Sequence, residues 1–202
     1  MTRVLEEVRA HLRGHFTGRG IDREPDSASV TFLGVERVEV LRFGPDPDGV
    51  LHYVSLGCSR HPMGDAAAVA VDPLRGPRAE VVVALHDSVP TPGLARTVAL
   101  LAATPAVDGL VLVPDALIDV GAPLWERPAG LPPFSAVVLG PSGIGDVALD
   151  PPRDPVTFLA ATPITANEAA WVRLKGVDAL RETWRQAGID VTDPQRVGSQ
   201  PT

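Results

Sequence analysis

Hydrophobic positions recur along this chain with two different periods. Between residues 3 and 16 the apolar side chains follow helical spacing and charged side chains take the other positions, which predicts an amphipathic helix. From residue 28 to residue 56 apolar and polar side chains alternate, as in half-buried strands. Pro45–Gly49 is a turn by composition and divides this stretch, so we expect a hairpin over residues 36–56.

Strand-sized apolar runs continue through the middle of the chain. Residues 67–71 and 79–85 flank a proline-containing turn and are expected to pair as a second hairpin. The segments 114–133 and 140–155 are long and rich in proline and glycine, and Trp125 is the expected anchor of the first. Further strand-like runs occupy residues 110–113, 135–139 and 156–161. The regular spacing of these runs predicts one antiparallel sheet.

Three further helices are predicted from their end signals. Thr91 and Pro92 favour a helix start, with Thr91 as the N-cap, and Pro105 is expected to end that helix. Thr165 and Glu168 have the spacing of a capping box, in which each side chain binds the other residue's free backbone amide. This box predicts a helix from Thr165 to about residue 175. Another helix is expected between a cap at residue 178 and a stop at residue 188.

Composition excludes several architectures. The chain contains 21 prolines and 19 glycines in 202 residues, too many for long coiled coils and without the period of three that collagen needs. Hydrophobic residues make up 45%, enough for a real core, so disorder is not expected. The net charge of −7 argues against a nucleic-acid partner and is compatible with a basic protein partner.

Cysteine content and hydropathy predict the compartment. The single cysteine, Cys58, rules out an internal disulfide, which favours a reducing cytoplasm. Glu6 and Glu7 lie where a signal peptide would need an apolar stretch, and no run approaches the roughly 20 apolar residues of a membrane span. We therefore expect a cytoplasmic protein that does not enter the membrane.

The sequence contains no complete motif for a metal or cofactor. His11 and His15 are four residues apart on the first helix, but no third ligand lies nearby, so no metal site is expected. The segment Gly140–Gly145 lacks the lysine of a phosphate-binding loop and the glycine spacing of a nucleophile elbow. We expect it to be a turn, and no cofactor is predicted.

One cysteine-based alternative remains open. Cys58 follows a predicted strand, and His61 or His86 would supply the base of a small hydrolase or transferase. Against this, a lone cysteine is more often a small buried apolar residue.

The segment Leu51–Ser59 resembles the suppressor of fused family, whose members carry a strand of the type His-Tyr/Phe-Val-Thr/Ser-hydrophobic-Gly-x-Ser. Glu80–Leu85 is similar to the family's next long strand, and Phe158–Thr165, followed by Glu168, is similar to its strand-to-helix segment. The run from Glu80 lacks the arginine and aromatic positions that are usual there. The resemblance covers roughly residues 30 to 190.

The resemblance implies a protein-binding domain without catalytic activity. We expect one α+β domain over residues 1–192, a mixed and mostly antiparallel sheet flanked by helices, with a flexible tail at residues 193–202. Animal relatives sequester transcription factors, and bacterial relatives look like immunity proteins that neutralise polymorphic toxins by direct contact. The second role is the hypothesis for this chain, with a basic toxin domain as partner and Ser59, Arg60 and His61 as contact residues. A secretion-chaperone module with an exposed apolar groove is a further alternative.

Overall fold

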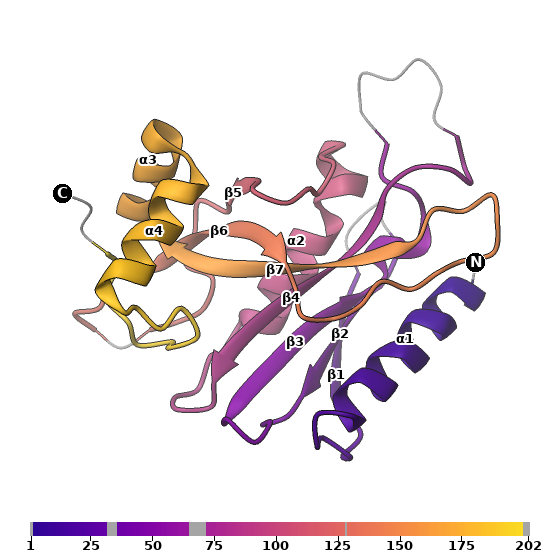
Figure 1. Cartoon of the computed structure of the whole chain (residues 1–202), viewed down its shortest axis with the longest axis horizontal. Coiled ribbons are helices and arrows are strands. Elements are labelled where there is room, and N and C mark those ends of the chain that lie inside the picture. Colours follow the sequence, from indigo (N-terminus) through magenta and orange to yellow (C-terminus); the bar gives the residue numbers. More distant parts are fainter. Residues whose placement is uncertain (1, 32–35, 65–71, 128, 200–202) are drawn as a thin grey trace.

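The computed structural model describes residues 2–31, 36–64, 72–127 and 129–199. They form one seven-stranded sheet with helices on both faces (Figure 1). The strands are β1 (Asp26–Val30), β2 (Val38–Phe43), β3 (Val50–Leu56), β4 (Arg78–His86), β5 (Leu117–Asp119), β6 (Phe134–Pro141) and β7 (Val156–Thr165). The helices are α1 (Thr2–Thr17), α2 (Leu94–Asp108), α3 (Ala166–Lys175) and α4 (Val177–Ala187), with a 3₁₀ turn η1 (Cys58–Arg60).

The strand order is β1-β2-β3-β4-β7-β6-β5. Strands β4 and β7 are parallel neighbours, and the other strand pairs are antiparallel. The predicted α+β class, with a mixed and mostly antiparallel sheet, is therefore confirmed. Because β4 and β7 run in the same direction, the chain must cross from one end of the sheet to the other between them. Helix α2, β5 and β6 lie in that crossing segment.

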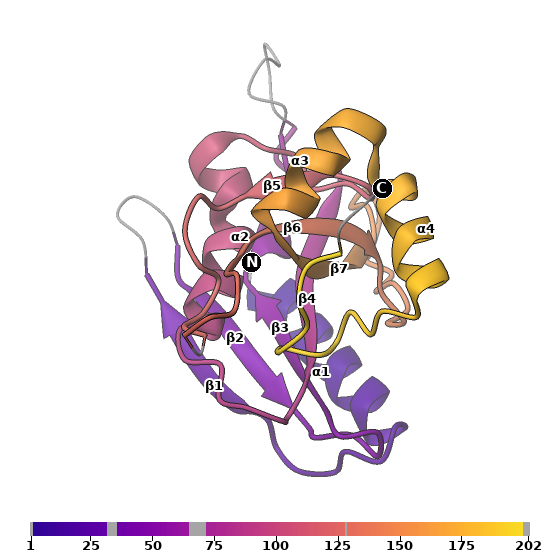
Figure 2. The same cartoon turned by 90° about the vertical axis from the view of Figure 1, so that its left-hand side faces the viewer.

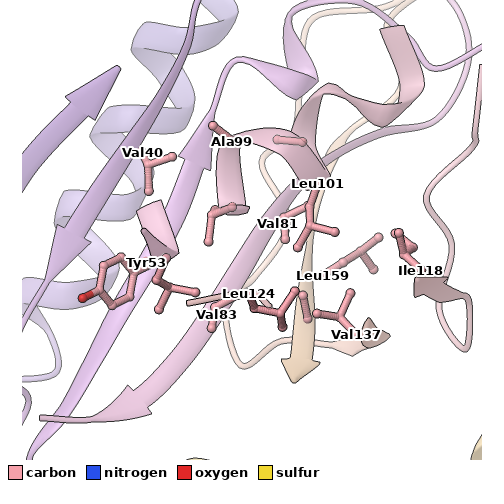
Figure 3. Close-up of a cluster of buried hydrophobic side chains, with 14 of the residues drawn as sticks. Val40, Tyr53, Val81, Val83, Ala99, Leu101, Ile118, Leu124, Val137 and Leu159 are labelled. Carbon is pink, nitrogen blue, oxygen red and sulfur yellow. The ribbon is translucent and has the colours of Figure 1, made fainter. Parts of the chain in front are cut away.

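Side chains alternate between the two faces of the sheet, and each face packs against a different set of helices. One face packs on α2 around a core that includes Val40, Val81, Leu101 and Leu159 (Figure 3). On the opposite face α1 covers β2, β3, β4 and β7, while α3 and α4 cover β6 and β7. Trp125 is buried in the α2 layer with its ring centroid 5.1 Å from that of Phe134, as its anchoring role predicts. None of the described helices has the length and apolarity needed to cross a membrane.

The first hairpin forms as predicted, and a buried carboxylate holds its turn. Asp46 accepts hydrogen bonds from the amides of Asp48 and Val50, both at 3.0 Å. Its other oxygen lies 2.9 Å from Nε2 of His52. Burial acts to raise the pKa of Asp46, but these bonds outweigh it and lower the pKa. The predicted partner strand of β4 at residues 67–71 lies outside the described residues.

The predicted ends of α2 are wrong at both termini. The helix begins after Gly93, because the Thr91 hydroxyl pairs with the Tyr53 hydroxyl at 3.2 Å instead of capping the helix. Pro105 lies inside the helix, where it removes the amide that would bond to the Leu101 carbonyl. The Thr104 hydroxyl donates to that carbonyl at 2.8 Å, so the carbonyl is still satisfied and the helix continues to Asp108.

Smaller differences concern strand and helix boundaries. Residues 110–113 form no strand, and the edge strand β5 lies a few residues further along, where no strand was predicted. Asp178 lies in the first turn of α4, and Gly176 takes the N-cap position. Gly176 and Gly188 end α3 and α4 as predicted.

The predicted capping box at the start of α3 is confirmed and is part of a buried polar cluster. Thr165 and Glu168 exchange side-chain-to-amide bonds, and the Glu168 side chain is fully buried. Glu168 also accepts hydrogen bonds from Arg196 at 2.8 Å and from the Trp184 indole at 2.9 Å. The amide and hydroxyl of Ser199 donate to the same carboxylate.

This cluster includes Arg196 and Ser199, which lie in the segment for which the sequence predicts a flexible tail. After α4 the chain turns back toward β7 and β4 (Figure 2), and the Thr192 carbonyl accepts from the His86 amide. Arg196 is buried and stacks over Phe134 and Trp184. A Cβ at Gly198 would lie 2.5 Å from Oγ1 of Thr165, so only glycine fits there. The donors of this segment bind a buried carboxylate. Sequence periodicity does not reveal such contacts between distant residues.

Protonation of Glu168 should weaken this cluster. Burial acts to raise the pKa of the carboxyl, but the hydrogen bonds and charge of Arg196, the Thr165 amide and the Trp184 indole lower the pKa from 4.5 to about 2. The lowered pKa means that ionised Glu168 stabilises the fold above pH 4.5 and that this stabilisation is lost as pH falls toward 2.

We expect Glu168→Gln to lower the free energy of unfolding by roughly 3–5 kcal/mol at neutral pH, because it leaves the Arg196 charge buried and unpaired. The variant should also lose less stability on acidification, since the wild type loses about 2 kcal/mol from this group alone between about pH 7 and pH 3. Urea unfolding at both pH values measures both effects. Glu182→Gln, on the exposed side of α4, is the control. An equal loss of stability on acidification in Glu168→Gln and in the wild type would show that Glu168 is not the group responsible.

Candidate functional site

The loop after β3 contains the three predicted contact residues, and a buried glutamate on β4 holds it. Glu80 accepts hydrogen bonds from the hydroxyl of Ser55 and from the amide of Gly57 at 2.9 Å. It also accepts from the amide and hydroxyl of Ser59, at 3.0 and 2.6 Å. Gly57 has a φ of 149°, and a Cβ there would lie 3.2 Å from the Arg37 carbonyl oxygen. The β3 motif therefore serves to turn the chain onto Glu80.

A buried arginine fixes the same loop from its carbonyl side. Arg78, at the start of β4, donates to the carbonyls of Ser59 and Arg60 at 2.8 and 3.0 Å, and to that of Leu74 at 3.3 Å. The loop thus has its amides bound to a carboxylate and its carbonyls bound to a guanidinium. Both groups are on one strand, β4, so the loop is rigidly positioned against the sheet.

The structure separates the three predicted contact residues. Ser59 is fully buried, so it positions the loop and presents no surface to a partner. Arg60 and His61 both bind Glu36, at 2.8 and 2.9 Å, and 16% of the Arg60 side chain is exposed. The hydrogen bond from Arg60, followed by that from His61, lowers the pKa of Glu36. Of the three, His61 is the most accessible, with 57% of its side chain exposed.

A second surface, which the sequence analysis did not single out, lies between α2 and β5. An apolar groove of about 610 Å³ runs along the C-terminal half of α2. Leu100, Val107 and Leu110 line it and are 37%, 59% and 40% exposed. Clustered exposed apolar side chains of this kind mark interaction sites. The groove is therefore the strongest candidate for protein contact on the described surface.

The groove is bordered by an open edge of the sheet. Strand β5 is the last in the strand order, and Ala116 and Val120 use their backbone groups to bond β6. Backbone groups alternate in direction along an antiparallel strand, so those of Leu117 and Asp119 face away from β6. Such groups can pair with an added strand. Asp108 also lines the groove and has no ion pair within the described residues.

A family model places this arrangement among known proteins. Residues 34–197 match the model for the suppressor of fused protein (SUFU). The chain belongs to the suppressor of fused family. The resemblance seen in the β3 motif is therefore confirmed, and the match also spans Glu80, α2, the groove and the Glu168–Arg196 pair. No curated protein sequence matches the chain.

Solved structures share the fold at low identity. A suppressor of fused homologue from Neisseria gonorrhoeae superposes with a TM-score of 0.68 at 19% identity, covering 100% of both chains. A chain of the Sufu–Fu complex gives 0.65 at 14% identity, covering 96% of this chain and 91% of that one. Drosophila Suppressor of Fused gives 0.61 at 13% identity, and 95% of this chain covers 50% of that chain. At these identities the likeness establishes a common fold.

In this family member Cys58 is not paired with a base. Burial, and next the charge of Glu80, raise the pKa of the Cys58 thiol well above its ordinary value, so the thiol stays protonated at neutral pH. Nε2 of His61 binds Glu36, and Nε2 of His86 binds Asp190 at 2.9 Å. The thiol–imidazole pair of the hydrolase alternative is thus not assembled.

The two histidines of α1 pack against aromatic rings. The ring of His11 stacks on Phe158 at 5.8 Å, and His15 contacts Phe16. Among the described residues there is no group of three or more metal-ligating side chains.

Two features of the sequence correspond to the groove. Leu100 and Val107 lie outside the buried stripe of α2, where polar residues are expected on an ordinary surface helix. The apolar run at residues 110–113 predicts a strand, but it forms a loop that exposes Leu110 and Val113. Either observation alone fits a buried element, so only their adjacency in the fold identifies the groove.

We expect Ser59→Ala to destabilise the fold while His61→Ala does not. The Ser59 hydroxyl donates to a buried carboxylate, and loss of such a bond costs roughly 1.5–3 kcal/mol, whereas removal of an exposed side chain changes stability by less than about 0.5 kcal/mol. The free energy of unfolding from urea titration measures both. Equal and small effects of the two substitutions would show that Ser59 does not hold the loop.

Proposed function

We propose that this domain binds a partner protein by taking an extended segment of it into the groove between α2 and β5. The observation that carries the proposal is the coincidence of an exposed apolar groove with an open sheet edge. An added strand would pair with the backbone of β5 and direct alternate side chains into the groove. The related Sufu–Fu complex supports a protein-binding role for the family.

The charge of the groove restricts which partner segments can bind there. Asp108 at the C-terminal end of α2 lies against the unfavourable negative end of the helix dipole, and a cation beside it would relieve both charges. Asp119, on β5, is bound to Arg173 at 2.5 Å. The segment that fits best therefore has apolar residues at alternate positions and a lysine or arginine at the end near Asp108.

We expect a random-peptide display library to yield peptides with this pattern. Val107→Asp should weaken their binding at least tenfold, because it introduces a desolvated charge into the groove. Leu174→Asp, an equally drastic change at a side chain 72% exposed on α3, should leave binding unchanged. Hydrogen exchange of the Leu117 and Asp119 amides should slow on binding. Equal binding by both variants would reject the groove, and unchanged exchange would reject strand addition.

We further propose that the partner is a toxin and that the domain is its immunity protein in the cytoplasm. The net charge of −7 supports this, since an acidic inhibitor attracts and covers a basic toxin domain. Arg60 and His61 are proposed as additional contacts at the rim of the η1 loop. A client-binding chaperone would use the same groove, but it would bind many segments with similar affinity.

We expect a gene beside this one to encode a toxic domain, and co-expression of this protein with that domain to restore cell growth. Val107→Asp should abolish protection and Leu174→Asp should retain it, while purified toxin and wild-type protein form a one-to-one complex by light scattering. Growth arrest despite wild-type protein would contradict the immunity role. Equal protection against unrelated toxins would favour a chaperone.

A further inference from the structure

An arginine-lined cleft lies between α1 and the η1 loop. It has a volume of about 360 Å³ and lies between the start of α1, η1, the start of β4 and the loop between β6 and β7. That loop runs beside the N-terminal end of α1 (Figure 1). Its lining includes four arginines and two acids: Arg3, Arg60, Arg78, Arg153, Glu7 and Asp150. This is a basic enclosure in a protein whose net charge is −7.

Two of the four arginines have their charge neutralised. Arg3 binds Glu7 at 2.9 Å and Asp150 at 3.0 Å, and these two acids also line the cleft. Arg60 binds Glu36 at 2.8 Å. The two acids that line the cleft, Glu7 and Asp150, are therefore both bound to Arg3. Asp154, which follows Arg153, accepts a hydrogen bond from the Gly76 amide.

The other two arginines, Arg78 and Arg153, have no ion-pair partner within the described residues. Arg78 is 2% exposed, donates to three carbonyls and leaves its buried Nε without a hydrogen-bond acceptor. Burial, followed by the charge of Arg153, lowers the pKa of Arg78, and Asp154 opposes this to a smaller extent. The two guanidinium groups thus repel each other across one cleft.

We propose that this cleft binds the phosphate group of a small molecule. Two guanidinium charges without partners match the charge of a phosphate monoester, which is about −1.5 to −2 at neutral pH. Arginine is suited to this role because its planar donors bind phosphate in a bidentate manner. The volume falls at the lower end of the range for small-molecule sites, roughly 300–1,000 Å³, so the cleft has room for more than the phosphate.

The two arginines have different tasks in this site. Arg78 lies at the base of the cleft, where its carbonyl partners fix it and burial strengthens its field. Arg153 is on the exposed loop and is free to direct its donors at the ligand. Because Arg78 also holds η1, its replacement would disturb the loop, and Arg153 is the residue to test.

Calorimetric titration at constant ionic strength tests the site with inorganic phosphate and O-phosphoserine as probes and chloride as the blank. We expect saturable binding of at least one phosphate probe and none of chloride. Arg153→Gln should weaken binding roughly tenfold or more, and Arg153→Lys should restore part of the loss. Arg96→Gln, the same change on the exposed face of α2, should leave binding within about twofold of wild type.

Every result of this titration either supports or overturns the phosphate site. Absence of saturable phosphate binding, or an equal loss in Arg153→Gln and Arg96→Gln, would overturn the site, because only a diffuse ionic effect would remain. Similar affinity for the two probes would identify the free ion as ligand, and tighter binding of O-phosphoserine would identify a monoester. Both of these results support the phosphate site. Val107→Asp should retain phosphate binding, so failure here leaves the proposed protein-binding function untouched.

Discussion

The parallel pairing of β4 with β7 is the constraint on which both candidate sites depend. Their register aligns Arg78 with Val156, so the two neighbouring strands start side by side, at the same end of the sheet. The buried Arg78 therefore lines the same cleft as Arg153, which lies just before β7. The same pairing requires a crossing over the sheet, and that crossing carries α2 and the edge strand β5, between which the apolar groove lies.

Two buried glutamates attach irregular segments to this sheet. Glu80, on β4, binds the loop after β3 through amides and hydroxyls. Glu168, just after β7, binds Arg196 and Ser199 from the end of the chain. In both cases an unpaired carboxylate would be costly in the interior, and most of its donors belong to segments outside the α-helices and strands. A fold so rich in proline and glycine is thus held by specific polar contacts as well as by its core.

The two proposed sites differ in the interactions that they offer. The groove presents apolar side chains and an unpaired strand edge, which suit a flexible protein segment. The arginine cleft presents positive charge, which suits a small anion. The η1 loop lies at the cleft and is held by Glu80 and Arg78 on β4. A rigid loop of this kind keeps Arg60 in the cleft wall whether or not a partner is bound.

Short-range patterns in the sequence are sufficient to predict the local elements: the amphipathic α1, the β2–β3 hairpin, the capping box at Thr165 and the family motif at β3. These depend on residues close together in the chain, where periodicity and capping chemistry act directly. Such patterns do not reveal that Ser59 faces inward, since the partner Glu80 lies 21 residues away. Long-range folding likewise brings Arg78 and Arg153 into one cleft and places α2 beside the edge strand β5. Strand order brings these residues together, and strand order depends on long-range packing that no local pattern encodes.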